Sequence, residues 1–134
     1  MKNSQVLIML ALIYSTNCNA QATAKDNITG TWKGTSLCQV KSSPCHDENV
    51  VYHISKAGND KNYSIQANKI INGAEDDMGT LAASYDETQQ TLTVRMNDNR
   101  NSVWLFKIDG KQMHGTLTED GKILYRLIEL KKLD

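Results

Sequence analysis

The sequence contains a single proline, one phenylalanine and eight glycines in 134 residues, and its 15 lysines and arginines are balanced by 15 aspartates and glutamates. Collagen-like and proline-rich chains are therefore excluded. A formal net charge of zero argues against a nucleic-acid partner, since phosphate binding needs an excess of clustered lysine and arginine. With 40% hydrophobic and 22% charged residues, the chain has the composition of a folded protein and the length of one domain.

Motifs of several enzyme classes are also missing. The sequence has no glycine-rich phosphate loop, no Gly-x-Ser-x-Gly elbow and no His-Glu-x-x-His motif. It has no Cys-x-x-Cys pair, and the acidic run at 75–77 lacks the spacing of an EF-hand. We therefore predict no cofactor, no metal ion and no catalytic residue. Enzymatic activity is left open, with the balance toward a non-enzymatic role.

Residues 1–22 have the order of a secretory signal. Lys2 is followed by an unbroken apolar run over 6–13 and then by small residues up to Ala22. The run is far shorter than the ~20 apolar residues that span a bilayer, and no later segment comes close. We expect a cleaved signal peptide at 1–22, no transmembrane span, and one domain at 23–134 that is secreted, periplasmic or held in the cell envelope.

The sequence has three cysteines. Cys18 lies just after the apolar run, where bacterial lipoproteins carry their lipid, so a lipid anchor is an alternative; the residues before it, 15–17, depart from the lipobox pattern. Removal of the leader leaves Cys38 and Cys45. In an oxidising compartment this pair predicts one disulfide that clamps a mainly polar loop. Closing so short a loop contributes on the order of 2–3 kcal/mol.

After the leader, short segments of alternating apolar and polar residues are separated by turn signals such as Asn72-Gly73 and Asp109-Gly110. The acidic residues 75–77 are predicted to extend the turn at 72–73 into a loop. We expect strands near residues 28–36, 50–55, 63–67, 79–85, 91–96, 103–108, 113–118 and 123–130.

The spacing of these segments predicts the fold. No window after the leader has apolar residues at helical spacing, so crossover helices are not expected. Short connections favour pairing between strands that are consecutive in the chain, and closing the sheet removes the edges that promote aggregation. The sequence therefore predicts an all-β fold, a single antiparallel up-and-down barrel of about eight strands.

The opening Ile28-Thr29-Gly30-Thr31-Trp32, followed by the strand meander, resembles the lipocalin, avidin and fatty-acid-binding superfamily of barrels. In lipocalins the Gly-x-Trp tryptophan closes one barrel end and a last-strand Arg or Lys packs on it, which implies structural roles for Trp32 and Arg126. The layout matches over nearly the whole mature chain, but few residues are identical. Lipocalins usually carry a helix after the barrel, and the sequence to 134 is not expected to form one, which departs from the pattern. The biotin-binding residues of avidin are not recognisable, so biotin binding does not carry over. Alternatively, Trp32 is an ordinary core residue and Arg126 a surface residue.

His46, Asp47 and Glu48 form the densest group of functional side chains, in the longest predicted connection. On the lipocalin-like resemblance, this connection lies over the open end of the barrel, so the three residues would line or cover a ligand entrance. If a strand begins near Glu48, alternation places Glu48 and His53 on opposite faces, which argues against a metal site here. In a simpler role, His46 or Asp47 bonds backbone groups of the loop.

Apolar residues at consecutive positions in 103–106 and 124–130 predict an apolar outer wall. Such a wall would be a homo-oligomer interface or a docking patch. The alternative is that strand twist turns these residues into the core.

The leading functional hypothesis is a lipocalin-like protein that holds a small, largely apolar molecule in the barrel. A second interpretation is a rigid protein-binding or inhibitory module that presents the clamped loop 38–49. A third is a metal-assisted or acid–base enzyme that uses His46, Asp47 and Glu48.

Overall fold

The structure is a computed structural model that describes residues 26–59 and 61–134. The predicted signal peptide with its cleavage site, and the alternative lipid attachment at Cys18, lie outside the described residues. Within the described ranges, no helix has the length and apolar character needed to cross a bilayer.

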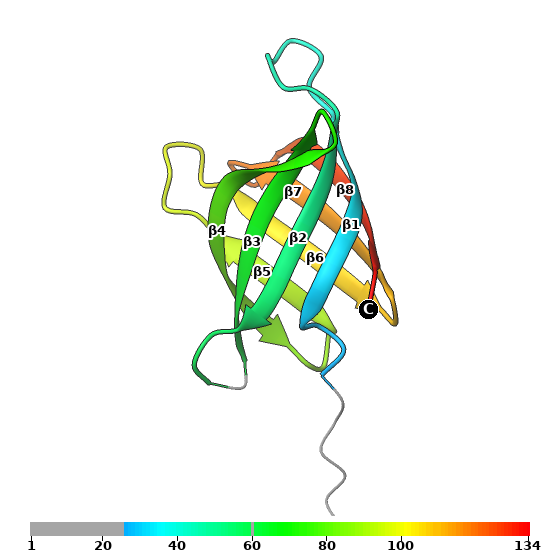
Figure 1. Ribbon diagram of the computed structural model, residues 1–134. Helices are drawn as coiled ribbons and strands as arrows, with labels where there is room; N and C mark the ends of the chain where they lie inside the picture. The colour runs from blue at the N-terminus through cyan, green and yellow to red at the C-terminus, as the bar shows by residue number, and fades with distance from the viewer. Residues whose placement is uncertain (1–25, 60) are drawn as a thin grey trace, which may run out of the picture.

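The chain forms a closed antiparallel barrel in which every strand pairs with the next and the last strand pairs with the first (Figure 1). The predicted all-β, up-and-down barrel is therefore confirmed. The strands are β1 (Gly30–Cys38), β2 (Glu48–Lys56), β3 (Asn62–Ile71), β4 (Ala74–Asp86), β5 (Thr91–Arg95), β6 (Val103–Asp109), β7 (Gln112–Glu119) and β8 (Ile123–Lys132).

Alternation along each strand separates the core from the outer wall. In β2, Val50, Tyr52 and Ile54 are buried, whereas His53 lies on the opposite face with the half-buried Thr31. Inward side chains from all parts of the sheet meet in one hydrophobic cluster. The largest fully buried hydrophobic side chains are Trp32, Tyr52, Phe106, Ile65, Leu92, Met113, Ile128 and Val50. Much of the barrel interior is therefore filled by the protein's own side chains.

One end of the barrel is closed by Trp32. The side chain is fully buried, and its Nε1 donates a hydrogen bond to the carbonyl oxygen of Ile28 at 2.8 Å. The cation over its ring is Lys132, the register partner of Trp32 on β8. Arg126 lies toward the other end of the same strand, opposite Cys38. The cation that packs on Trp32 is thus Lys132, not the Arg126 that the resemblance pointed to.

The acidic residues 75–77 belong to a strand, so the predicted loop at 72–77 is wrong. Only Asn72 and Gly73 form the turn; both have positive φ, 52° and 80°, as a two-residue hairpin requires. Glu75 is held against the outer wall because its carboxylate accepts a hydrogen bond from Asn68 and lies 2.7 Å from Nε2 of His53. These side-chain contacts extend the β3–β4 pairing to the hairpin tip.

Candidate functional site at the barrel mouth

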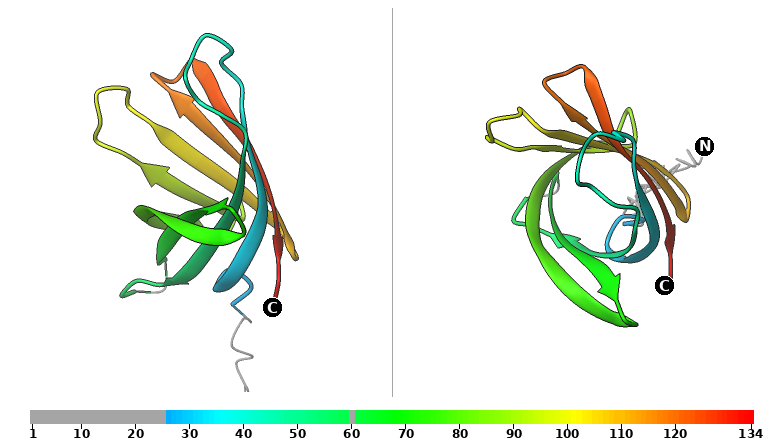
Figure 2. Two further views of the ribbon diagram at one scale, coloured as in Figure 1. Left: turned by 45° about the horizontal axis from the view of Figure 1, so that its top comes forward. Right: turned by 90° about the horizontal axis from the view of Figure 1, so that it is seen from above.

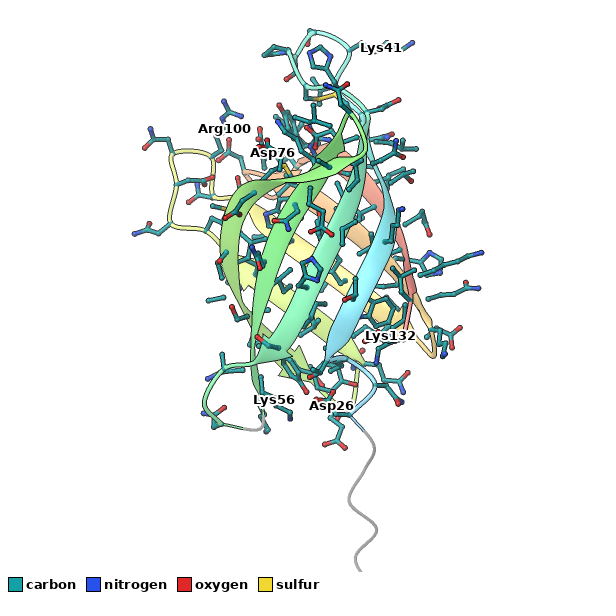
Figure 3. The ribbon with its side chains drawn as sticks, viewed as in Figure 1. Asp26, Lys41, Lys56, Asp76, Arg100 and Lys132 are labelled. Carbon is teal, nitrogen blue, oxygen red and sulfur yellow. A yellow bond between two sulfur atoms is a disulfide. The ribbon has the colours of Figure 1, made fainter. Side chains whose placement is uncertain are left out.

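The longest connection between described strands, residues 39–47, stands over the barrel end opposite Trp32 (Figures 1 and 2). We call it the mouth loop. Lys41 lies near its tip, whereas Lys132 lies near the other end of the barrel (Figure 3). A disulfide joins Cys38 to Cys45 across a Cα–Cα distance of 5.8 Å, which confirms the predicted pairing. The predicted position of this loop over one barrel end is also found.

Contacts with β8 fasten the mouth loop to the barrel. The Ser43 hydroxyl lies 2.7 Å from the Tyr125 hydroxyl, and the Gln39 amide donates to the Tyr125 carbonyl oxygen at 2.9 Å. Arg126 donates from Nη1 to the carbonyl oxygen of His46 at 3.0 Å. The loop is therefore tied at both ends, by the disulfide and by two neighbouring residues of β8.

Tyr125 and Arg126 come together because β8 contains a β-bulge. Leu117 of β7 pairs with Arg126, and Thr118 pairs with Leu124, so Tyr125 is an extra residue without a register partner. A bulge re-aims the side chain of the inserted residue. The Arg126 guanidinium carbon lies 5.9 Å from the centroid of the Tyr125 ring, so a cation and an aromatic ring stand side by side at the mouth.

Arg126 also organises a polar cluster on the inner wall beneath the mouth loop. Its Nη1 donates to the carbonyl and hydroxyl oxygens of Ser36, both at 3.2 Å, and lies 3.6 Å from Oε2 of Glu48. The Arg126 and Glu48 side chains are only 12% and 24% exposed. Below them, burial raises the pKa of Tyr52 far above its usual value; the Arg126 charge opposes this and Glu48 adds to it. Tyr52 is therefore a neutral phenol. Arg126 links Ser36 of β1, Glu48 of β2 and the mouth loop.

The three residues singled out from the sequence separate in the structure. Glu48 begins β2 on the inner wall, whereas the side chains of His46 and Asp47 are exposed. Asp47 accepts a hydrogen bond from the Cys38 amide at 2.8 Å, as the simpler interpretation of this loop expects. His46 contributes its backbone carbonyl to Arg126. In the part of the chain that the structure describes, no group of three or more His, Cys, Asp or Glu residues is arranged to hold a metal ion.

A pocket of about 380 Å³ opens at the mouth, between the inner side of β6 to β8 and the loop 96–102. Met96, Trp104 and Leu117 supply its apolar wall, and Tyr125 joins it to the bulge. Its remaining lining residues are polar or charged: Asp98, Asn99, Arg100, Ser102 and Glu119. The site thus combines an apolar floor with a polar rim, as small-molecule sites usually do.

Trp104 is the residue of this pocket with an unsatisfied polar atom. Its ring stacks on Phe106 at a centroid distance of 6.1 Å and an interplanar angle of 19°. Its Nε1 is buried and has no hydrogen-bond acceptor among the described residues. A buried donor without a partner costs free energy, so Trp104 is held here by its packing and not by a hydrogen bond.

The pocket rim is held in place before any ligand arrives. Asp98 accepts hydrogen bonds from the Ser102 amide at 2.9 Å and the Ser102 hydroxyl at 2.7 Å, which hold the pKa of its carboxyl below the usual value. Arg100 donates to Glu119 at 3.1 Å across the rim. A rim ordered in advance lowers the entropy that binding would otherwise cost.

Sequence reasoning missed this pocket because it left open whether the apolar residues at 103–106 form an outer wall or turn into the core. The available signal was alternation, since Trp104 shares its strand face with the fully buried Phe106. Leu117 lies in register with both Trp104 and Arg126. These three residues form one row across β6, β7 and β8 on the inner wall of the barrel at the mouth.

Comparison with protein-family models and with curated proteins gives no match for this chain.

Proposed function

We propose that this protein binds a small, largely apolar molecule at the barrel mouth, with its apolar part against Met96, Trp104 and Leu117. The observation that carries the proposal is the 380 Å³ pocket, which has an apolar wall that includes Trp104 and a polar rim. The barrel interior is occupied by large buried side chains, so the ligand sits in the mouth pocket and not deep in the barrel, where the sequence-based hypothesis placed it.

The chemistry of the walls defines the ligand class. Burying apolar ligand surface contributes about 25 cal/mol per Å². A pocket of about 380 Å³ fits a compact ring-containing or branched molecule. A hydrogen-bond acceptor on the ligand, such as a carbonyl or ether oxygen, would meet the donors of the polar rim, Asn99 and Arg100, and orient the ligand. Tyr125 extends the aromatic surface toward the mouth loop.

The Cys38–Cys45 disulfide supports the accompanying proposal that the protein works outside the reducing cytoplasm. Together with the leader-like segment 1–22, it favours a secreted or periplasmic binding protein. In the alternative, the exported protein is held at a membrane by a lipid on Cys18.

Fluorescence of the neutral probe N-phenyl-1-naphthylamine tests the proposal, because its emission rises in apolar surroundings. Met96→Asp places a charge on the apolar floor of the pocket and should weaken probe binding about tenfold or more. Met78→Asp is a matched control, since Met78 and Met96 are 42% and 41% exposed and Met78 lies on β4, away from the pocket. Equal loss of binding in both variants, or binding unchanged by Met96→Asp, would contradict the proposal.

A further inference from the structure

The outer side of β6, β7 and β8 carries an exposed apolar area. Leu105 of β6 lies in register with Thr116 of β7, and Thr116 with Leu127 of β8. Leu37 of β1 continues this row. The three leucines are 46%, 37% and 38% exposed, in the order Leu105, Leu127 and Leu37. Hydrophobic side chains that adjoin on an outer sheet face are a common mark of an interaction surface.

A second apolar row lies beside the first, toward the mouth. Val103 of β6 is in register with Thr118 of β7, and Thr118 with Leu124 of β8, which is 39% exposed. In both rows, β6 and β8 supply apolar side chains and β7 supplies a threonine between them. The upper part of this face therefore carries no charge on any of the three strands.

The part of this face farther from the mouth carries charged residues on β6 and β8. In one row Lys107 of β6 and Glu129 of β8 flank His114 of β7, which pairs with Glu129, while Lys107 donates to the carbonyl oxygen of Gln89. In the next row Asp109 of β6 and Lys131 of β8 flank Gln112. At each height, β6 and β8 carry opposite charges. β6 and β8 lie two strand spacings apart, roughly 9–10 Å, so a direct salt bridge between them within one chain is not favoured.

Asp109 and Lys131 make no ion pair with any residue of the described chain. The register neighbour of Lys131 on β1 is Lys33, a like charge that does not stabilise it. The two side chains are exposed. Each is the residue of opposite charge to the other, two strands away on the same face.

We propose that this face is the interface of a homodimer whose two-fold axis runs parallel to β7. Rotation about that axis lays β6 of one copy over β8 of the other at the same height, and symmetry produces each contact twice. The pairs brought together are Val103 with Leu124, Leu105 with Leu127, Lys107 with Glu129, and Asp109 with Lys131. On β6 and β8, apolar residues meet apolar residues and charged residues meet residues of opposite charge.

The shared face defines a small interface. β6 to β8 are three strands wide with four outward positions on each strand, roughly 400 Å² per copy from the usual strand spacing and rise. Two copies would bury about 800 Å², the size of a weak, reversible interface. Aligned packing of two sheets about 10 Å apart is a common arrangement. The mouth pocket lies on the inner side of the sheet and stays accessible in this dimer.

Charge reversal at Asp109 and Lys131 tests the axis. In sedimentation equilibrium of the purified protein, D109K and K131D should each raise the dimer dissociation constant about tenfold, because each places like charges together twice. The double variant D109K/K131D should return the constant to within about threefold of the parent value, because the pairs are restored with reversed sign. A double variant as weak as the singles, or singles equal to the parent, would overturn the proposed axis.

A second pair of variants tests the face itself. Leu105→Glu puts a charge at the apolar centre and should make the protein monomeric at concentrations where the parent is a dimer. Ala82→Glu, on the exposed outer side of β4, is the control and should leave the dimer intact. Both positions are exposed, and circular dichroism should show that both variants fold. A parent protein that stays monomeric up to millimolar concentration would overturn the proposal.

Discussion

The ammonium nitrogen of Lys132 lies 5.8 Å from the centroid of the Trp32 ring, at the barrel end opposite the disulfide. Lys132 also donates to the carbonyl oxygen of Asn27 at 3.2 Å. The last strand thus closes this end over the first strand, with a cation–π contact and a hydrogen bond to the segment that precedes β1.

This contact should contribute a measurable but small stabilisation. Lys132→Met keeps the aliphatic stem and removes the charge, so the free energy of unfolding should fall by about 0.5–1 kcal/mol. Lys122→Met, in the exposed turn between β7 and β8, is the control and should change it by less than about 0.5 kcal/mol. Urea denaturation measures both variants. Equal effects would show that the contact with Trp32 contributes nothing specific.

Removing only one member of the Arg126–Glu48 pair should destabilise the protein. Arg126→Met removes four contacts made by Nη1 and leaves the half-buried Glu48 carboxylate without its cation. We expect a loss of about 2–3 kcal/mol in the free energy of unfolding. Adding Glu48→Gln to this variant should restore part of the loss. If the double variant is less stable than Arg126→Met, the charge at Glu48 is not the cause.

The disulfide should matter for global stability and for the mouth loop. Replacing Cys38 and Cys45 together by serine should lower the free energy of unfolding by about 2–3 kcal/mol. It should also speed hydrogen exchange of the Gln39 amide, which donates to Tyr125. Unchanged exchange at Gln39 would mean that contacts with β8 alone order the loop.

Stability should fall in acid partly because of Asp98. Hydrogen bonds from the Ser102 amide and hydroxyl lower the pKa of its carboxyl in the folded state, so the unfolded chain binds a proton more readily. Its contribution is complete above the unfolded pKa, near 4, and is lost as the pH falls through the lower folded value. Asp98→Asn should therefore show a shallower loss of stability below about pH 4. Thermal unfolding from pH 7 to pH 2 measures this, and a slope equal to the parent's would contradict it.

Alternation predicted the barrel and the two faces of β2 correctly, because period-two burial is local information. It could not decide which cation covers Trp32. Arg126 and Lys132 are an even number of residues apart on β8 and share the inner side, so only the pairing of Trp32 with Lys132 selects one. Register depends on the whole closed sheet.

The mouth pocket could not be predicted from the sequence either. The bulge at Tyr125 inserts one residue into β8, and no turn residue in the sequence marks it. The strand at 74–77 was misassigned because acidic residues are poor strand formers; here Asn68 and His53 bind Glu75 and hold the hairpin.

The most direct test of ligand binding at the mouth uses the two tryptophans as separate reporters. Trp104 borders the pocket, and Trp32 is fully buried at the far end. In a ¹⁵N–¹H NMR titration with N-phenyl-1-naphthylamine, the indole N–H resonance of Trp104 should shift progressively and saturate while that of Trp32 stays in place. If the probe leaves Trp104 unmoved, or shifts Trp32 alone, the mouth is not where this protein binds apolar molecules.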